Sequence, residues 1–201
     1  MLIKLLKYDL KWIYKVVAVF YCLSLFFSVT SFCFSKVENS ALFSGLYTFS
    51  NAFAIAMVVN GVINSIIRAW VRFRNNIYKD ESYLTHTLPV SLNLIYLSKV
   101  LSAVICIFTS TAVAAGCLVI CFWNNNSIVD YLKTMLESAA GSFNLSAGSL
   151  FAALFFEIFL QLVFILLLGY NGMILGHRSG RNKMVTSIIV GFAMYTVSNT
   201  V

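Results

Sequence analysis

The chain has 201 residues, of which 60% are hydrophobic and only 10% are charged, and its formal net charge is +7. Soluble domains are about 45–50% apolar and about 25% charged, and a soluble domain of this size has too much surface to bury so many apolar side chains. The composition therefore excludes a soluble enzyme, a nucleic-acid-binding domain and a secreted disulfide scaffold. It indicates an integral membrane protein.

Residues 1–15 predict a basic amphipathic helix, because lysines and apolar residues separate onto two faces at about 100° per residue. The two sets are Lys4, Lys7, Lys11 and Lys15 on one face, and Ile3, Leu6, Leu10, Ile13 and Val17 on the other. We expect this helix to lie along the inner membrane surface, with its lysines toward anionic headgroups. The alternative is a simple cytoplasmic extension of the first membrane span.

Long apolar segments follow, and a helix needs about 20 residues to cross about 30 Å of hydrocarbon. Four are plain, at residues 16–34, 47–67, 94–123 and 150–175. A fifth begins near Met184 and is still apolar at Val201. Lipid admits only helices and closed barrels, and the strand alternation of a barrel is absent. We therefore predict an all-α bundle of five transmembrane helices, forming a single domain over residues 1–201.

The basic residues gather on one side of these spans. Of the 14 lysines and arginines, only Lys36 and Lys133 fall in the opposite loops, which leaves 12 on the side of the N-terminus. The positive-inside rule then places the N-terminus in the cytoplasm.

The loop between the second and third spans is long enough for a short helix of its own, within residues 78–91. Asp80 or Ser82 can cap this helix, and Pro89 ends it near residue 87. Its apolar points are Tyr83, Leu84 and Leu88, and its polar edges are Asp80, Glu81, Thr85, His86 and Thr87. A short amphipathic helix of this kind suits a groove of another protein. The alternative is a loop held only by its own membrane.

A few polar and small residues lie within the predicted spans. Glu157 lies in the fourth span with Gln161 one turn deeper, and an acidic residue near the centre of a span costs roughly 2.5–3.5 kcal/mol. Two interpretations stay open for this pair: a carboxylate on a substrate or proton path, or a hydrogen-bonded group that ties helices together. Asn60 and Asn64, on one face of the second span, are weaker candidates for the same roles.

Gly172 and Gly176 form a G-x-x-x-G pair in the fourth span. Small residues at this spacing let two helices approach closely. We therefore expect helix packing here, either within the chain or between two copies.

Motifs for catalysis are missing from the sequence. It contains no G-x-x-x-x-G-K-[ST] phosphate loop and no H-E-x-x-H zinc motif. Cys117 and Cys121 lie one helical turn apart with no histidine or carboxylate near them, so we interpret them as packing residues and predict no metal site. We expect a non-enzymatic chain whose energy, if it transports a substrate uphill, comes from a partner or an ion gradient.

The loop between the second and third spans, together with the start of the third span, resembles the corresponding segment of ATP-binding-cassette permeases of the type-2 exporter class. It is most similar to small permeases of Gram-positive bacteria that serve peptide-antibiotic export and immunity. The residues that carry the resemblance are Asp80, Glu81, Tyr83, Leu84, Thr87, Leu88, Pro89, Val90, Ser91, Ser98 and Lys99. Ser82 departs from the pattern, since many relatives have glycine there.

The resemblance implies a coupling helix at residues 80–89 that docks into a separate ATPase subunit. It also implies a second permease copy, identical or different, and the bacterial plasma membrane as the location. ATP and Mg²⁺ would bind to the partner and no cofactor to this chain, and the exported substrate would be a hydrophobic peptide or antibiotic. The family usually has six spans, so one hypothesis is that this chain is C-terminally incomplete.

Two other functions remain as alternatives. One is an ion-coupled secondary transporter that uses Glu157. The other is a membrane immunity or scaffold protein that transports nothing.

Overall fold

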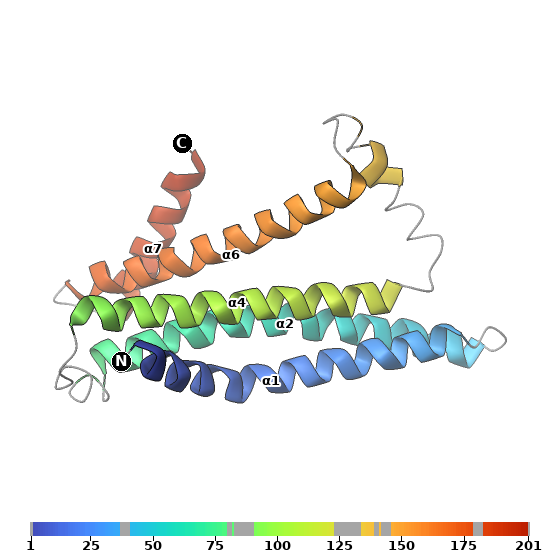
Figure 1. Cartoon of the computed structure of the whole chain (residues 1–201), viewed down its shortest axis with the longest axis horizontal. Coiled ribbons are helices and arrows are strands. Elements are labelled where there is room, and N and C mark those ends of the chain that lie inside the picture. The colour runs from blue at the N-terminus through green and yellow to red at the C-terminus, as the bar shows by residue number, and fades with distance from the viewer. Residues whose placement is uncertain are drawn as a thin grey trace. The chain divides into compact units, whose positions relative to one another are not determined.

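The computed structural model describes residues 2–36, 41–79, 82, 91–122, 134–138, 141, 146–178 and 183–200 (Figure 1). Its long elements are five α-helices: α1 (Leu2–Ser35), α2 (Ala41–Tyr78), α4 (Leu92–Phe122), α6 (Ala147–His177) and α7 (Lys183–Thr200). The described residues contain no β-strand. Over the part of the chain that the structure describes, the prediction of an all-α fold is therefore confirmed.

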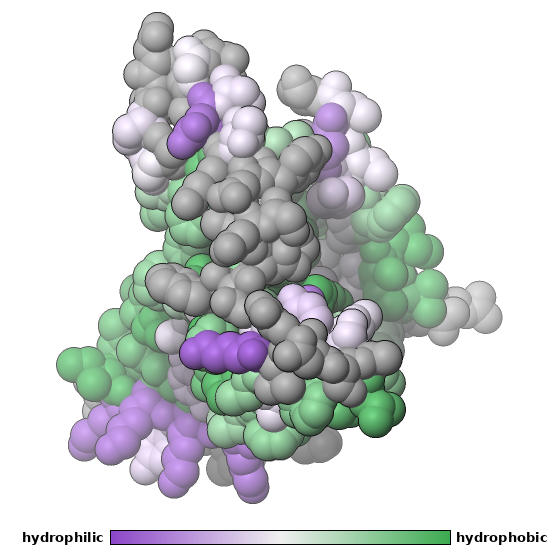
Figure 2. Space-filling model, turned by 90° about the vertical axis from the view of Figure 1, so that its right-hand side faces the viewer, coloured by the Kyte–Doolittle hydropathy of each residue, from purple (hydrophilic) through white to green (hydrophobic). Residues whose placement is uncertain are grey.

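Four helices are long and apolar enough to cross a membrane, namely α1, α2, α4 and α6. They contain the described residues of the first four predicted spans, and they make this a membrane-embedded protein. Large apolar side chains such as Phe26, Phe49 and Phe156 are exposed on them, and Figure 2 shows hydrophobic surface, in green, over the flanks of the face in view. This surface suits contact with lipid tails. The fifth predicted segment forms α7, which has 18 residues and is not among those four.

The chain divides into two compact units, and α1, α2, α4 and α6 each contribute one part to each unit. Unit 1 consists of residues 1–14, 65–107 and 160–201, and unit 2 consists of residues 15–64 and 108–159. Unit 1 contains most of the basic residues, both helix ends that flank the 80–89 loop, and all of α7. Its largest buried side chains are Ile13, Phe73, Ile107, Leu166 and Tyr170.

Unit 2 has a core of small side chains. Ser24, Ser28 and Ser31 of α1 are buried, as are Cys117 and Cys121 of α4. The hydroxyl of Ser28 donates to the carbonyl of Ser24 at 2.7 Å, and that of Ser24 donates to the carbonyl of Tyr21 at 2.9 Å. The backbone of α1 thus satisfies these two hydroxyls, and the small side chains let α1 and α4 pack closely.

The segment predicted as an amphipathic helix is helical over its described residues. Residues 2–15 are helical, but they run into the first span without a break as one helix, α1. The buried side of this segment is formed by Asp9 and Ile13, whereas Ile3 is 79% exposed. The buried face therefore overlaps the apolar stripe, to which Ile13 and Val17 belong, and it extends to Asp9 at the edge of that stripe. The continuous helix agrees with the alternative interpretation, an extension of the first span.

Candidate functional site

An ion cluster in unit 1 joins three helices at Asp9. The carboxylate of Asp9, on α1, accepts from Lys99 Nζ of α4 at 2.5 Å and from Arg72 Nε of α2 at 3.0 Å. Ser98 Oγ of α4 also donates to it, at 3.3 Å. We call Asp9, Arg72, Ser98 and Lys99 the Asp9 cluster. The side chains of Asp9 and Lys99 are only 3% and 4% exposed, so the pairing offsets part of the cost of burying both charges.

The basic side chains beside this cluster also contact an aromatic ring. The guanidinium carbons of Arg72 and Arg68 lie 5.3 Å and 5.6 Å from the centre of the Trp12 ring of α1. A cation over an indole face within about 6 Å is attracted by the ring quadrupole. The contact gives a second link between α1 and the C-terminal part of α2.

An aromatic cluster joins the ends of α2, α4 and α6 in the same unit. The ring of Phe73, on α2, stacks on Tyr170 of α6 with centroids 4.2 Å apart, and it meets Tyr96 of α4 edge to face at 6.1 Å. Tyr78, the last residue of α2, stacks on His177, the last residue of α6, at 3.9 Å. The residues next to the 80–89 loop are thereby held against α6.

A glycine-lined contact completes unit 1. A Cβ atom added at Gly172 would lie 2.8 Å from the carbonyl oxygen of Ser187, and one at Gly176 would overlap Ser187 itself. The two glycines therefore lie where α6 packs against α7 within this chain. A Cβ atom at Gly169 would overlap the indole of Trp70, whose Nε1 donates to the carbonyl of Leu166 at 3.1 Å.

The predicted coupling residues lie outside the described part of the chain. They are Asp80, Glu81, Tyr83, Leu84, Thr85, His86, Thr87, Leu88 and Pro89. Between them only Ser82 is described; it is helical, and its backbone N–H donates to the carbonyl of Lys79 at 2.8 Å. The helix predicted here stays a prediction. The structure describes α2, which precedes this loop, and α4, which follows it.

The polar candidates within the spans do not come together. Glu157 and Gln161 are exposed on α6. Asn60 and Asn64 of α2 donate to the carbonyls of Ala56 and Asn60, four residues earlier in their own helix, at 2.9 Å and 3.0 Å. The two asparagines thus form hydrogen bonds within their own helix. Both interpretations of Glu157 require it to face other helices or a substrate path. Its exposed position shows that it does not face the interior of this chain.

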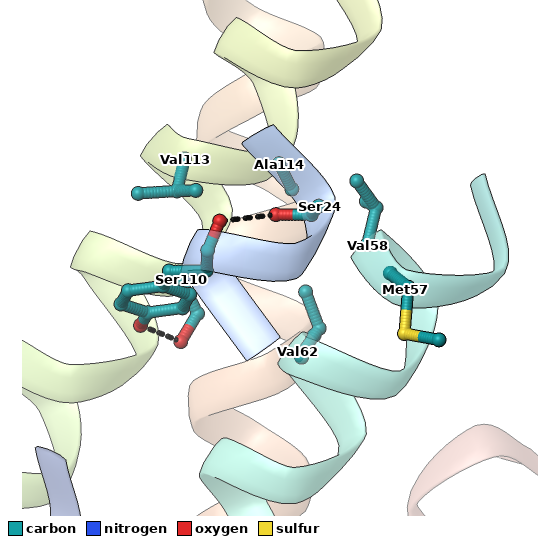
Figure 3. A pocket seen from close by; sticks show the side chains of 9 residues that line it. Ser24, Met57, Val58, Val62, Ser110, Val113 and Ala114 are labelled. Carbon is teal, nitrogen blue, oxygen red and sulfur yellow. Dashed lines mark hydrogen bonds between the residues drawn. The ribbon is translucent and has the colours of Figure 1, made fainter. Parts of the chain in front are cut away.

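One small cavity lies in unit 2, between α1, α2 and α4 (Figure 3). The hydroxyls of Tyr21 and Ser110, which lie 2.5 Å apart, and the side chains of Ser24, Met57 and Val62 are on its wall. Its volume is about 10 Å³, close to the minimum that a single water molecule needs. The cavity is too small for a transported substrate.

Sequence reasoning missed Asp9, which organises the described site. The signal was present, since Asp9 is the only acidic residue among the four lysines of residues 1–15. It also lies four residues before Ile13, on the side of the helix that is buried. An isolated acid on the inward side of a basic helix indicates a buried basic partner elsewhere in the chain.

Comparisons of the chain with protein-family models, with curated proteins and with solved structures find no match.

Proposed function

We propose that this chain is the membrane-spanning subunit of an ATP-driven exporter, a permease of the ATP-binding-cassette type that works with a separate ATPase. The observation that carries the proposal is the position of the loop with the coupling-like sequence. It joins α2 to α4, and Asp9 binds one basic side chain from each of these helices. A force applied to the loop therefore reaches α1 directly.

The transmission route follows from the contacts of unit 1. Docking of the ATPase on residues 80–89 displaces the end of α2 and the start of α4. The Asp9 cluster passes the displacement to α1, and the stacked rings of Phe73 and Tyr170 pass it to α6. Packed cores transmit such shifts because they deform little. Two copies of the permease, each pushed by one ATPase, then rock against each other, and the substrate passes between them.

Further parts of the proposal follow from the charge distribution and the family resemblance. The N-terminus lies in the cytoplasm, because most basic residues belong to unit 1 together with the N-terminal segment. The membrane is the bacterial plasma membrane, and the fifth apolar segment, which forms α7, is a fifth span. ATP and Mg²⁺ bind to the ATPase subunit. The substrate class is a hydrophobic peptide or antibiotic.

The proposal is tested by purifying the full chain gently from its own membranes and measuring the ATPase that stays bound. We expect a stoichiometric ATPase with the wild-type chain, and at least a tenfold loss with Glu81→Lys or with the double change Tyr83→Ala and Leu84→Ala. Lys36→Glu, a charge reversal in the loop after α1, is the matched control and keeps the ATPase. An ATPase that stays bound to all the loop variants overturns the coupling assignment.

A further inference from the structure

Helix α6 is much less covered by the rest of the chain than the other three helices that are long and apolar enough to cross a membrane. In its most apolar 18-residue stretch only 6% of the residues are buried, against 22% in α1 and 33% in both α2 and α4. Its contact with α4 in unit 2 runs through Phe155 and Phe159, whose rings meet Phe108 at centroid distances of 6.5 Å and 5.5 Å. One side of α6 is therefore packed, and the opposite side is open.

Glu157 lies on the open side. It is two residues from both Phe155 and Phe159, which places it about 160–200° around the helix from them. Its side chain is exposed, and no described residue forms an ion pair or a hydrogen bond with it. Lipid tails offer no hydrogen-bonding group, so this carboxyl group needs a partner from another molecule at the same depth.

We propose that the open side of α6 is the interface between two copies of this chain, with Glu157 at its centre. Glu157 and Gln161 together form a self-complementary surface, since a carboxylate accepts hydrogen bonds and an amide N–H donates them. A twofold interface brings the same surface together from both subunits, so Glu157 of each copy lies within reach of Gln161 of the partner subunit. A second copy inserted in the same direction carries this group at the same depth.

Neighbouring residues suit a helix–helix interface around this pair. Ala153, four residues before Glu157, is small and exposed, which lets two helices approach closely. Gln161, exposed four residues after Glu157 in the same helix, adds an amide that both donates and accepts hydrogen bonds. The inference deepens the proposed function, which needs two permease copies, by assigning the surface through which they meet.

The test measures self-association of the full chain in liposomes by energy transfer between donor- and acceptor-labelled copies. We expect wild-type dimers. Glu157→Gln keeps an association constant within about threefold, because amides also pair, whereas Glu157→Leu lowers it at least tenfold. Phe156→Leu, about a quarter of a turn away on an exposed position, is the matched control and associates like the wild type. Thermal unfolding checks that each variant folds. The Glu157→Leu variant is expected to fold, because an apolar side chain suits the apolar surroundings of this position.

Three outcomes overturn the inference: a monomeric wild type, undiminished dimers of Glu157→Leu, or a Glu157→Gln variant as weak as Glu157→Leu. No ATPase is present in this measurement. A chain that dimerises through α6 but binds no ATPase therefore refutes only the proposed function. A chain that binds an ATPase but fails the dimer test refutes only the interface.

Discussion

At the scale of single residues, Asp9 contributes most to holding the described site together. Its carboxylate lies within 3.0 Å of two basic groups from two other helices. A buried ion pair adds little net stability over an apolar pair of the same shape, but removal of one partner leaves a buried charge without compensation. The consequence is a site that holds α1, α2 and α4 in one arrangement.

Asp9→Asn is therefore expected to lower the free energy of unfolding by about 3–5 kcal/mol, because Lys99 keeps its charge in a buried position. Denaturant unfolding of the detergent-solubilised chain measures the change. Adding Lys99→Met to Asp9→Asn removes the buried charge and should restore more than half of the loss.

Lys11→Met, at an exposed position of the same helix, serves as the control and should change the stability by no more than about 0.5 kcal/mol. An Asp9→Asn variant as stable as this control would show that the cluster does not hold the helices.

The residues of this cluster also show what sequence can and cannot predict. The described residues of each predicted span lie within one helix, because an uninterrupted apolar run in lipid has only that solution. The Asp9 pairs join residues 63 and 90 positions apart, and no local pattern specifies which helices meet. Hydropathy also gave no sign that α6 is open to its surroundings, because a helix buried in protein and a helix facing lipid are equally apolar.

At the scale of elements, the contact of α6 with α7 depends on the absence of side chains. The backbone of α7 at Ser187 and Gly191 lies within 3.0 Å of where a Cβ atom of Gly172 would be. Backbone atoms at this distance cannot move aside as a flexible side chain can. The small residues of α6 therefore determine how closely α7 packs.

Gly172→Ala is expected to destabilise the chain by about 1–3 kcal/mol through overpacking, and to make α7 more accessible to a protease. Gly148→Ala is the matched control in the same helix, since nothing lies within 4 Å of the added Cβ atom there. Alanine favours helix over glycine, so the control should be neutral or slightly stabilising. Limited proteolysis and thermal unfolding measure both variants. Equal behaviour of the two would contradict close α6–α7 packing.

At the scale of the whole molecule, four apolar helices embed the chain in a membrane. The contacts of unit 1 and the contacts of unit 2 suit different roles. Unit 1 links the helix ends around the 80–89 loop through charges and aromatic rings. Unit 2 packs small side chains and leaves one side of α6 open. This division fits a subunit that receives force at the loop and meets a second copy elsewhere.

Docking of an ATPase on residues 80–89 is tested with a photo-crosslinking amino acid placed at Leu84 of the full chain in its native membranes. We expect a covalent adduct between position 84 and a nucleotide-binding ATPase, with a yield that changes when ATP is added. The same amino acid at Lys36, in the loop after α1, should give no such adduct. The absence of an ATPase adduct at position 84, or equal yields at the two positions, would contradict the proposed role of the loop.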